Sequence, residues 1–226
     1  MVPVLPVRSQ TSLSGLYALT PDCADTERLD GQVRAALAGG ASAIQYRNKA
    51  AAPALRREQA RMLREACIDC GATFIVNDDV DLAGMVDADG VHLGRDDATV
   101  ASARMRLGPK AIIGVSCYDS LAYADAAVGS GADYIAFGSF FPSSVKPEAV
   151  RATKSLLSAA KLRWKVSVVA IGGITAANAS SLIAAGADAV AVISDIFEQT
   201  DLRAIERRAR AIAALFRDRL DPAASP

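Results

Sequence analysis

The segment GADYIA, residues 131–136, recurs in altered form as GADAVA at residues 186–191 and as GGASAI at residues 39–44. Each copy leads from an amphipathic stretch into an apolar run. Glycine at such a junction is typical of a helix C-cap, because it enters the left-handed backbone region at no steric cost. The three copies therefore predict a repeated helix-to-strand joint, as alternating β/α folds use.

Eight short apolar runs divide the chain. Each is nearly continuous in apolar residues, which is typical of parallel strands that are buried on both faces. The runs lie at residues 16–19, 43–46, 73–76, 90–93, 112–115, 134–137, 167–170 and 189–193.

Amphipathic stretches with helical spacing separate these runs. Pro53 can open one of these helices at its first position, and Gly71 can end it. Alternating strands and helices predict a parallel sheet, and eight units predict closure into a single (β/α)8 TIM barrel of the α/β class. An open doubly wound sheet is the alternative, but it would usually carry a glycine-rich fingerprint after its first strand. This chain has ALTPDC there instead, at residues 18–23.

We therefore expect one TIM-barrel domain over residues 15–220, a flexible N-terminal lead-in over residues 1–14 and a C-terminal tail over residues 221–226. The 25 Lys and Arg residues balance 25 Asp and Glu residues, which argues against bulk nucleic-acid binding. No stretch reaches the roughly 20 apolar residues of a membrane span, and the N-terminus lacks the apolar region of a signal peptide. We expect no nucleic-acid or membrane partner and a cytoplasmic location, while a homo-oligomer stays open.

In a TIM barrel, function lies on the loops that follow the strands. The segment QYRNK, residues 45–49, follows the second run with two cations and two amides, which suits a phosphorylated ligand. An ordinary solvated loop is the alternative for this segment.

Carboxylates follow the next two runs, in the segments Asn77-Asp78-Asp79 and Arg95-Asp96-Asp97. Carboxylates on adjacent strand ends can share one Mg²⁺, which takes few protein ligands and keeps water or phosphate oxygens. The alternative for Asp78 or Asp79 is a helix N-cap.

His92 is the only histidine and lies inside the fourth run. A general base or a ligand is one interpretation, but we expect a barrel histidine that is satisfied by hydrogen bonds. A single histidine without a plausible triad also argues against a serine or cysteine nucleophile.

Two further regions carry polar loops. The segment FGSFFPSSVKPEA, residues 137–149, is typical of a loop that binds or gates a ligand. Gly172-Gly173 after the seventh run and Ile193-Ser194 after the eighth lie where such barrels commonly hold phosphate, although tight turns are the alternative. The residues together predict two anion sites with a divalent metal near one of them, as in a phosphate-handling lyase, isomerase or transferase.

Segments of this chain follow, in order, the motifs of one known family: YALTPD, QYRNK, VNDDVDLA, DGVHLG followed by Asp97, GVS, FFPSSVK, AIGGIT and AVAVIS. Over residues 16 to about 197 the chain resembles thiamine-phosphate synthase. The joint occurrence of VNDD, DGVHLG and the loop lysine makes the resemblance specific, whereas AIGGIT alone occurs in many barrels.

The resemblance implies a Mg²⁺-dependent transferase of thiamine diphosphate biosynthesis. Its substrates would be 4-amino-2-methyl-5-(diphosphooxymethyl)pyrimidine and a thiazole phosphate, and its products thiamine phosphate and pyrophosphate. The implied mechanism is dissociative: pyrophosphate leaves first, and the thiazole nitrogen captures a pyrimidine carbocation. Such a step needs charge stabilisation and positioning more than a general base.

The resemblance also assigns residues. Asp78 and Asp97 would bind Mg²⁺, and the catalytic contacts would be Arg47, Ser116 and Lys146. The pyrimidine diphosphate would contact Gln45, Arg47, Lys49, Asn77, Ser116 and Lys146, and the thiazole phosphate would contact Ser143, Gly173, Ile193 and Ser194. The neighbouring residues that complete the predicted substrate-binding set are Tyr46, Asn48, Ser144 and Val145.

Four residues depart from the family pattern, and they bear on ligand geometry rather than on the reaction class. Asn48 stands where Glu is usual, Arg95 where Gln is usual, Ser139 where Pro is common, and Val145 where a Thr hydroxyl is usual. Two alternatives stay open: a thiazole tautomerase relative of the same fold, and a non-catalytic barrel that binds a phosphorylated ligand. Neither would need the complete diphosphate-and-metal set.

Overall fold

The computed structural model describes residues 13–142, 150–199 and 201–220, and the side chains of α9 as far as residue 217. Eight parallel strands pair in chain order, and β8 pairs with β1 to close the barrel. This confirms the predicted (β/α)8 fold, and each strand overlaps its predicted run. The strands are β1 (Gly15–Leu19), β2 (Ala41–Tyr46), β3 (Thr73–Asn77), β4 (Gly90–Leu93), β5 (Ile112–Tyr118), β6 (Tyr134–Phe137), β7 (Ser167–Ile171) and β8 (Ala189–Val192).

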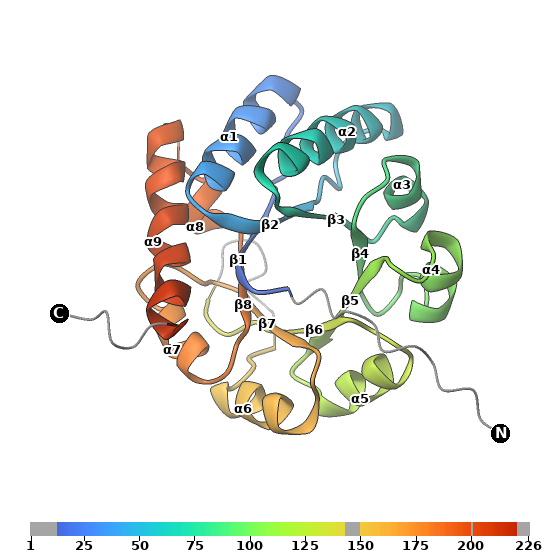
Figure 1. Cartoon of the computed structure of the whole chain (residues 1–226), viewed down its shortest axis with the longest axis vertical. Helices are drawn as coiled ribbons and strands as arrows, with labels where there is room; N and C mark the ends of the chain where they lie inside the picture. The colour runs from blue at the N-terminus through green and yellow to red at the C-terminus, as the bar shows by residue number, and fades with distance from the viewer. Residues whose placement is uncertain (1–12, 143–149, 200, 221–226) are drawn as a thin grey trace.

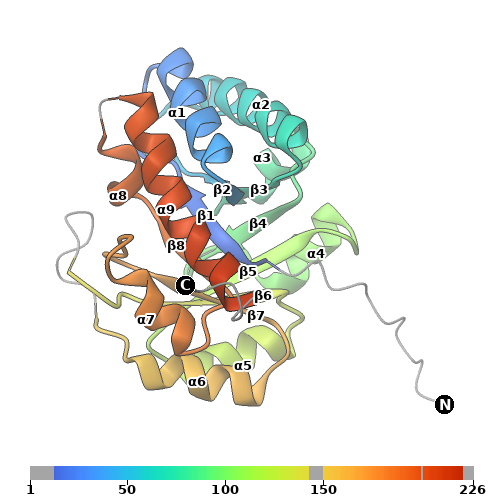
Figure 2. The ribbon, with the colours of Figure 1, turned by 60° about the vertical axis from the view of Figure 1, so that its left-hand side comes forward.

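Helices surround the strands on the outside of the ring (Figure 1). They are α1 (Thr26–Ala38), α2 (Pro53–Cys70), α3 (Val80–Met85), α4 (Val100–Leu107), α5 (Leu121–Gly129), α6 (Lys154–Arg163), α7 (Ala179–Ala184), α8 (Ser194–Phe197) and α9 (Leu202–Leu220). As predicted, α2 begins at Pro53 and ends at Gly71, whose φ of 66° is left-handed. The last helix, α9, packs between α1 and α7 and so completes the outer layer (Figures 1 and 2).

The apolar residues form two layers because successive strand residues point to opposite faces of the sheet. One layer fills the space between strands and helices, and the other fills the barrel interior. Leu13, inside the predicted lead-in, is buried in the interior layer, so packing begins before β1. No helix in the described ranges has the length and hydropathy needed to cross a membrane.

The interior depends on one large side chain and one missing side chain. The ring of Tyr134 on β6 crosses over Gly114 on β5, and a Cβ at Gly114 would lie 1.8 Å from the Tyr134 Cζ. Glycine is therefore required at residue 114 for space, and this space lets a tyrosine hydroxyl reach the middle of the barrel.

Gly114→Ala should destabilise the fold by about 2 kcal/mol or more, because overpacking a close-packed interior commonly costs that much. The matched control is Gly129→Ala at the end of α5, where an added Cβ meets nothing within 4 Å. That variant should be neutral or slightly stabilising. Urea unfolding of both variants measures the difference, and equal stabilities would contradict this account of the interior.

Candidate active site

A cavity of about 720 Å³ lies at the carboxyl ends of the strands, and all eight strands contribute to its wall. We refer to it as the main cavity. It brings together predicted residues from distant parts of the chain: Gln45, Arg47, Asn77, Ser116, Gly173, Ile193 and Ser194. Because closure of the barrel places all strand ends on one rim, residues from β2 and β8 can face one ligand.

A smaller hollow of about 260 Å³, the side hollow, lies where β2 and β3 meet the start of α2. Arg47 and Asn77 line both spaces, so a ligand could extend from one to the other. The other predicted residues that line the side hollow are Tyr46, Asn48, Lys49 and Asp78.

The side chains of Gln45 and Tyr46 lie on opposite faces of β2, and residues 47–49 follow the strand. Gln45 points into the barrel, where its Nε2 donates to Tyr17 Oη at 2.7 Å. Tyr46 points outward and donates its hydroxyl to Gln59 Oε1 at 2.9 Å. Asn48 Nδ2 donates to the Cys23 carbonyl at 2.6 Å and to the same Gln59 oxygen at 3.0 Å. The polar groups of Tyr46 and Asn48 are thus engaged within the protein, and they hold the segment in place.

Three cations line the side hollow, and each lies beside a carboxylate. Such pairing keeps the cations in position without burying an uncompensated charge. The nitrogen–oxygen pairs are Arg47 with Asp22 at 3.6 Å, Lys49 with Asp78 at 3.0 Å, and Arg56 with Asp79 at 3.4 Å.

Asp78 and Asp79 have different roles in the structure. Asp79 is the N-cap of α3, and its Oδ1 accepts from the Leu82 N–H at 2.9 Å. The N-cap interpretation is thus correct for Asp79. Asp78 has a φ of 62° and donates its own N–H to the His92 carbonyl at 2.8 Å. A left-handed conformation at a non-glycine residue costs free energy, and such strain concentrates at functional sites.

Asp97 lies near Asp78 at the adjacent strand end. Its Oδ2 accepts from the Gly94 N–H at 2.7 Å. Partial burial raises the pKa of Asp97, the neighbouring Asp78 carboxylate raises it further, and the Gly94 N–H and Lys49 lower it. Two carboxylates with few other ligands fit Mg²⁺, which keeps water and phosphate oxygens around it. Within the described ranges, no group of three or more His, Cys, Asp and Glu side chains is placed to hold a metal.

His92 is hydrogen-bonded at both ring nitrogens, as predicted for a barrel histidine. Its Nδ1 lies 2.9 Å from Tyr134 Oη, and its Nε2 lies 2.9 Å from Ser116 Oγ. Burial lowers the pKa of His92 from 6.5 to about 4, and the Asp97 charge opposes this shift only in part. The imidazole is therefore neutral in the folded protein near pH 7.

The lowered pKa of His92 makes the fold sensitive to mild acid. Between about pH 6.5 and pH 4 the unfolded chain binds a proton that the folded chain does not, so stability falls as the pH falls. From pH 7 to pH 5 this residue should cost about 2 kcal/mol of unfolding free energy. Urea unfolding of the wild type and of His92→Gln at both pH values isolates the contribution, and an equal pH dependence of the two proteins would contradict it.

The loops after β7 and β8 form the opposite wall of the main cavity. Gly172 and Gly173 have φ values of 105° and 63°, and a Cβ at Gly173 would lie 2.2 Å from the Pro142 carbonyl oxygen. Asn178 holds the turn by donating to the Gly173 carbonyl at 3.0 Å. The glycine pair therefore forms a tight turn and also lines the cavity, beside Ile193 and the Ser194 that starts α8.

The remaining predicted site residues, Ser143, Ser144, Val145 and Lys146, lie outside the described residues. Sequence reasoning missed Arg56, which lines the side hollow from α2. Its position three residues after Pro53 could have indicated this placement, because the first turn of a barrel helix lies beside the end of the preceding strand. Sequence reasoning also missed Tyr17 and Tyr134. Each places a hydroxyl inside an otherwise apolar run, which could have indicated a polar contact in the barrel interior.

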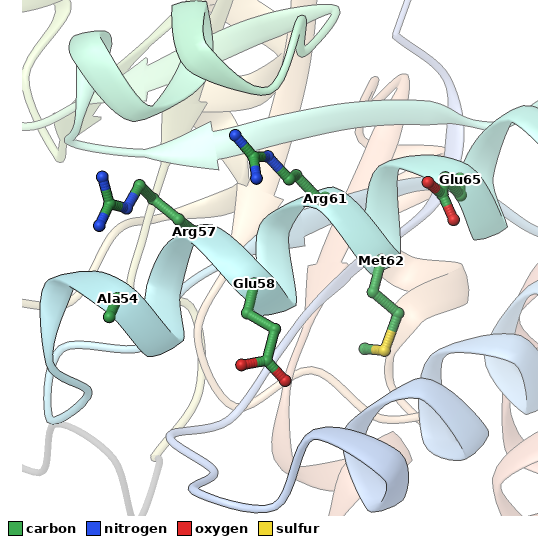
Figure 3. A pocket seen from close by; sticks show the side chains of 6 residues that line it. All are labelled: Ala54, Arg57, Glu58, Arg61, Met62 and Glu65. Carbon is green, nitrogen blue, oxygen red and sulfur yellow. The ribbon is translucent and has the colours of Figure 1, made fainter.

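A third hollow lies outside the barrel, along α2 alone (Figure 3). Arg57 and Arg61 extend from one side of the helix, and Glu58 and Met62 extend from the other. All of its lining residues belong to this one helix. Unlike the main cavity, it does not bring together side chains from several strands and helices.

The fold and the site define a class of protein: a TIM-barrel enzyme whose strand ends place cations and carboxylates around one cavity. The model of the thiamine monophosphate synthase family matches residues 16–196. The chain belongs to this family.

Individual relatives agree with the family match. A thiamine-phosphate synthase from Thiobacillus denitrificans is 54% identical over 194 residues, which cover 86% of this chain and 92% of the relative. One from an Azoarcus species is 52% identical over 204 residues, or 90% and 98% of the two chains. The solved thiamine phosphate pyrophosphorylase from Pyrococcus furiosus superposes with a TM-score of 0.79 at 35% identity, covering 90% of this chain and 96% of that one. These findings support thiamine-phosphate synthase, a transferase, and favour neither the tautomerase nor the non-catalytic alternative.

Proposed function

We propose that this chain joins 4-amino-2-methyl-5-(diphosphooxymethyl)pyrimidine to a thiazole phosphate, with Mg²⁺, and releases thiamine phosphate and pyrophosphate. One observation carries the proposal: the side hollow places Arg47, Lys49 and Arg56 beside Asp78, at the edge of a large cavity. A diphosphate attached to an aminopyrimidine ring fits this combination of a charged recess and a larger neighbouring cavity.

The side hollow and the main cavity would hold different parts of the two substrates. The diphosphate would occupy the side hollow, and the pyrimidine ring would extend past Asn77 into the main cavity between Gln45 and Ser116. The thiazole phosphate would lie against the opposite wall, at Gly173, Ile193 and Ser194. In this arrangement the thiazole nitrogen can approach the pyrimidine methylene carbon from the side opposite the diphosphate.

Asp78 and Asp97 would hold the Mg²⁺ ion, since their carboxylates lie close together and the Asp78 charge helps to raise the pKa of Asp97. When bound, Mg²⁺ neutralises charge on the diphosphate oxygens as a Lewis acid. Lys49, at 3.0 Å from Asp78, can turn its ammonium group to the same diphosphate.

The chemistry breaks the bond between the methylene carbon and the diphosphate oxygen, and the electron pair leaves with pyrophosphate. The thiazole nitrogen then supplies its lone pair to the carbon, and no proton moves. The cations of the side hollow stabilise the departing charge, and apolar residues such as Leu19, Val169 and Ile171 limit the access of water to the carbocation. His92, neutral and bonded at both nitrogens, is not needed as a base.

Family resemblance alone supports the roles of residues 143–146, which lie outside the described residues. Lys146 would add a cation to the departing pyrophosphate, and Ser143 would contact the thiazole phosphate, next to Ser144 and Val145 in the sequence. We also infer a cytoplasmic location, which the four free cysteines favour.

Incubation of the purified chain with both substrates and Mg²⁺ tests the proposal directly. Thiamine phosphate and pyrophosphate should form in equal amounts. Conversion of the thiazole phosphate without the pyrimidine substrate would indicate a tautomerase, and binding of either substrate without turnover would indicate a non-catalytic barrel. Both outcomes contradict the proposal.

Asp78→Asn should lower turnover at saturating substrate roughly 100-fold or more, as removal of an electrostatic contact to a developing charge commonly does. Asparagine tolerates the left-handed φ of 62°, so the backbone should survive. Asp81→Asn is the control, because Asp81 is exposed and pairs only with Arg106 among the described contacts. Rates measured across a Mg²⁺ titration check the prediction, and an unchanged Mg²⁺ dependence would remove Asp78 from the metal site.

Arg56→Gln should raise the KM for the pyrimidine diphosphate about tenfold or more. Arg56 lines the side hollow with its Nη1 3.4 Å from Asp79, and a hydrogen bond from this guanidinium to a charged diphosphate is worth about 1.5–3 kcal/mol. The matched control is the next residue, Arg57→Gln, whose side chain lines the third hollow, the one along α2 outside the barrel (Figure 3). Steady-state kinetics and inhibition by pyrophosphate measure both variants. Equal behaviour of the two would exclude Arg56 from the diphosphate site.

A further inference from the structure

We propose that a one-directional chain of hydrogen bonds crosses the barrel interior from Gln45 to Ser116 and directs the Ser116 hydroxyl hydrogen into the main cavity. Tyr17, Tyr134 and His92 are then positioning residues that act through Ser116. The functional part of this inference rests on the proposed function, because it concerns how the same cavity presents a donor to its substrate.

The hydrogen-bond chain joins five strands through four contacts in the barrel interior. The contacts are Gln45 Nε2 to Tyr17 Oη at 2.7 Å, Tyr17 Oη to Tyr134 Oη at 3.0 Å, Tyr134 Oη to His92 Nδ1 at 2.9 Å, and His92 Nε2 to Ser116 Oγ at 2.9 Å. Gln45, Tyr17, Tyr134 and His92 are buried, and Ser116 is half-buried on the cavity wall. Gln45, Tyr17 and His92 also line the main cavity, but Ser116 is the most exposed member of the hydrogen-bond chain.

The direction follows from counting hydrogens. The Gln45 amide nitrogen can only donate, so Tyr17 Oη accepts and can pass its own hydrogen to Tyr134. Tyr134 then donates to His92 Nδ1, which leaves the single proton of the neutral imidazole on Nε2, facing Ser116. In the reverse direction Tyr17 would accept from both Gln45 and Tyr134, and no other recorded contact in the described residues would take its hydrogen. A buried hydroxyl hydrogen without an acceptor is costly.

Packing holds the rings in the orientation that this order requires. The Tyr134 and His92 rings stack at 5.5 Å between centroids and 23° between planes. Tyr17 meets Tyr134 edge-on, at 6.1 Å and 85°. Neither tyrosine can turn its hydroxyl away without breaking these contacts, and Gly114 supplies the space under the Tyr134 ring.

The order of donors determines what Ser116, the last residue of the hydrogen-bond chain, presents to the main cavity. Ser116 Oγ receives the His92 Nε2 proton, so its own hydrogen is not used inside the barrel and faces the main cavity. The site thereby presents a directed neutral donor, suited to an acceptor atom on the substrate. A serine whose hydroxyl donated to histidine would present only lone pairs and would repel the same atom.

The first experiment reads the tautomer directly. His92 is the only histidine of the chain, so a long-range ¹H–¹⁵N spectrum of the labelled full-length protein near pH 7 contains one imidazole pattern. We expect the pattern of a neutral ring protonated at Nε2. A ring protonated at Nδ1, a charged ring, or averaging between the two tautomers would overturn the proposal. This measurement needs neither a variant nor activity, so failure of the proposed function would leave its result readable.

The second experiment tests whether the hydrogen-bond chain affects the reaction through Ser116. Tyr134→Phe should lower kcat/KM for thiamine phosphate formation by roughly tenfold in the wild type and leave it unchanged in a Ser116→Ala background, as a coupled pair does. An equal loss in both backgrounds would mean that Tyr134 only supports the fold, and would refute the coupling. The control is Cys117→Ala, which alters a buried neighbour on the opposite face of β5 and should preserve kcat/KM.

Discussion

The pairing of β8 with β1 closes the sheet, and the rest of the site depends on that closure. An open sheet of the same strands would place the end of β2 and the end of β8 at different edges. Closure puts them on one rim, so that Arg47 after β2 and the glycine turn after β7 face one cavity. Strand alternation then decides which side chains enter it, because every second residue of a strand points inward.

The electrostatics of the rim are balanced locally. Each cation of the side hollow has a carboxylate beside it, yet the carboxylates Asp78 and Asp97 also lie near one another. In the ligand-free site the opposite charges offset one another. A diphosphate could then take the cations as partners, and a metal ion could take the carboxylates. This arrangement also explains how a chain with equal numbers of acidic and basic residues can still hold a strongly anionic substrate.

The barrel interior is polar at its centre, where a close-packed protein would ordinarily be apolar. Burial of Tyr17, Tyr134 and His92 is tolerable because each finds a partner, and a fully satisfied network is rigid. The same rigidity connects the two sides of the main cavity through Gln45 and Ser116. The interior is thus a structural core that also orders the hydrogens of the site.

The sequence by itself determined the strands, the closure and most of the rim. Apolar runs, glycine joints and strand order are local or additive features, and adjacency of Asp78 and Asp97 follows from consecutive parallel strands. Only the tertiary structure separated Asp79, which caps a helix, from Asp78, and placed Arg56 at the side hollow. It alone revealed the hydrogen-bond chain, since Tyr17 and Tyr134 are 117 residues apart. Contacts at such separations depend on side-chain direction across the closed barrel, and no local pattern in the sequence encodes that direction.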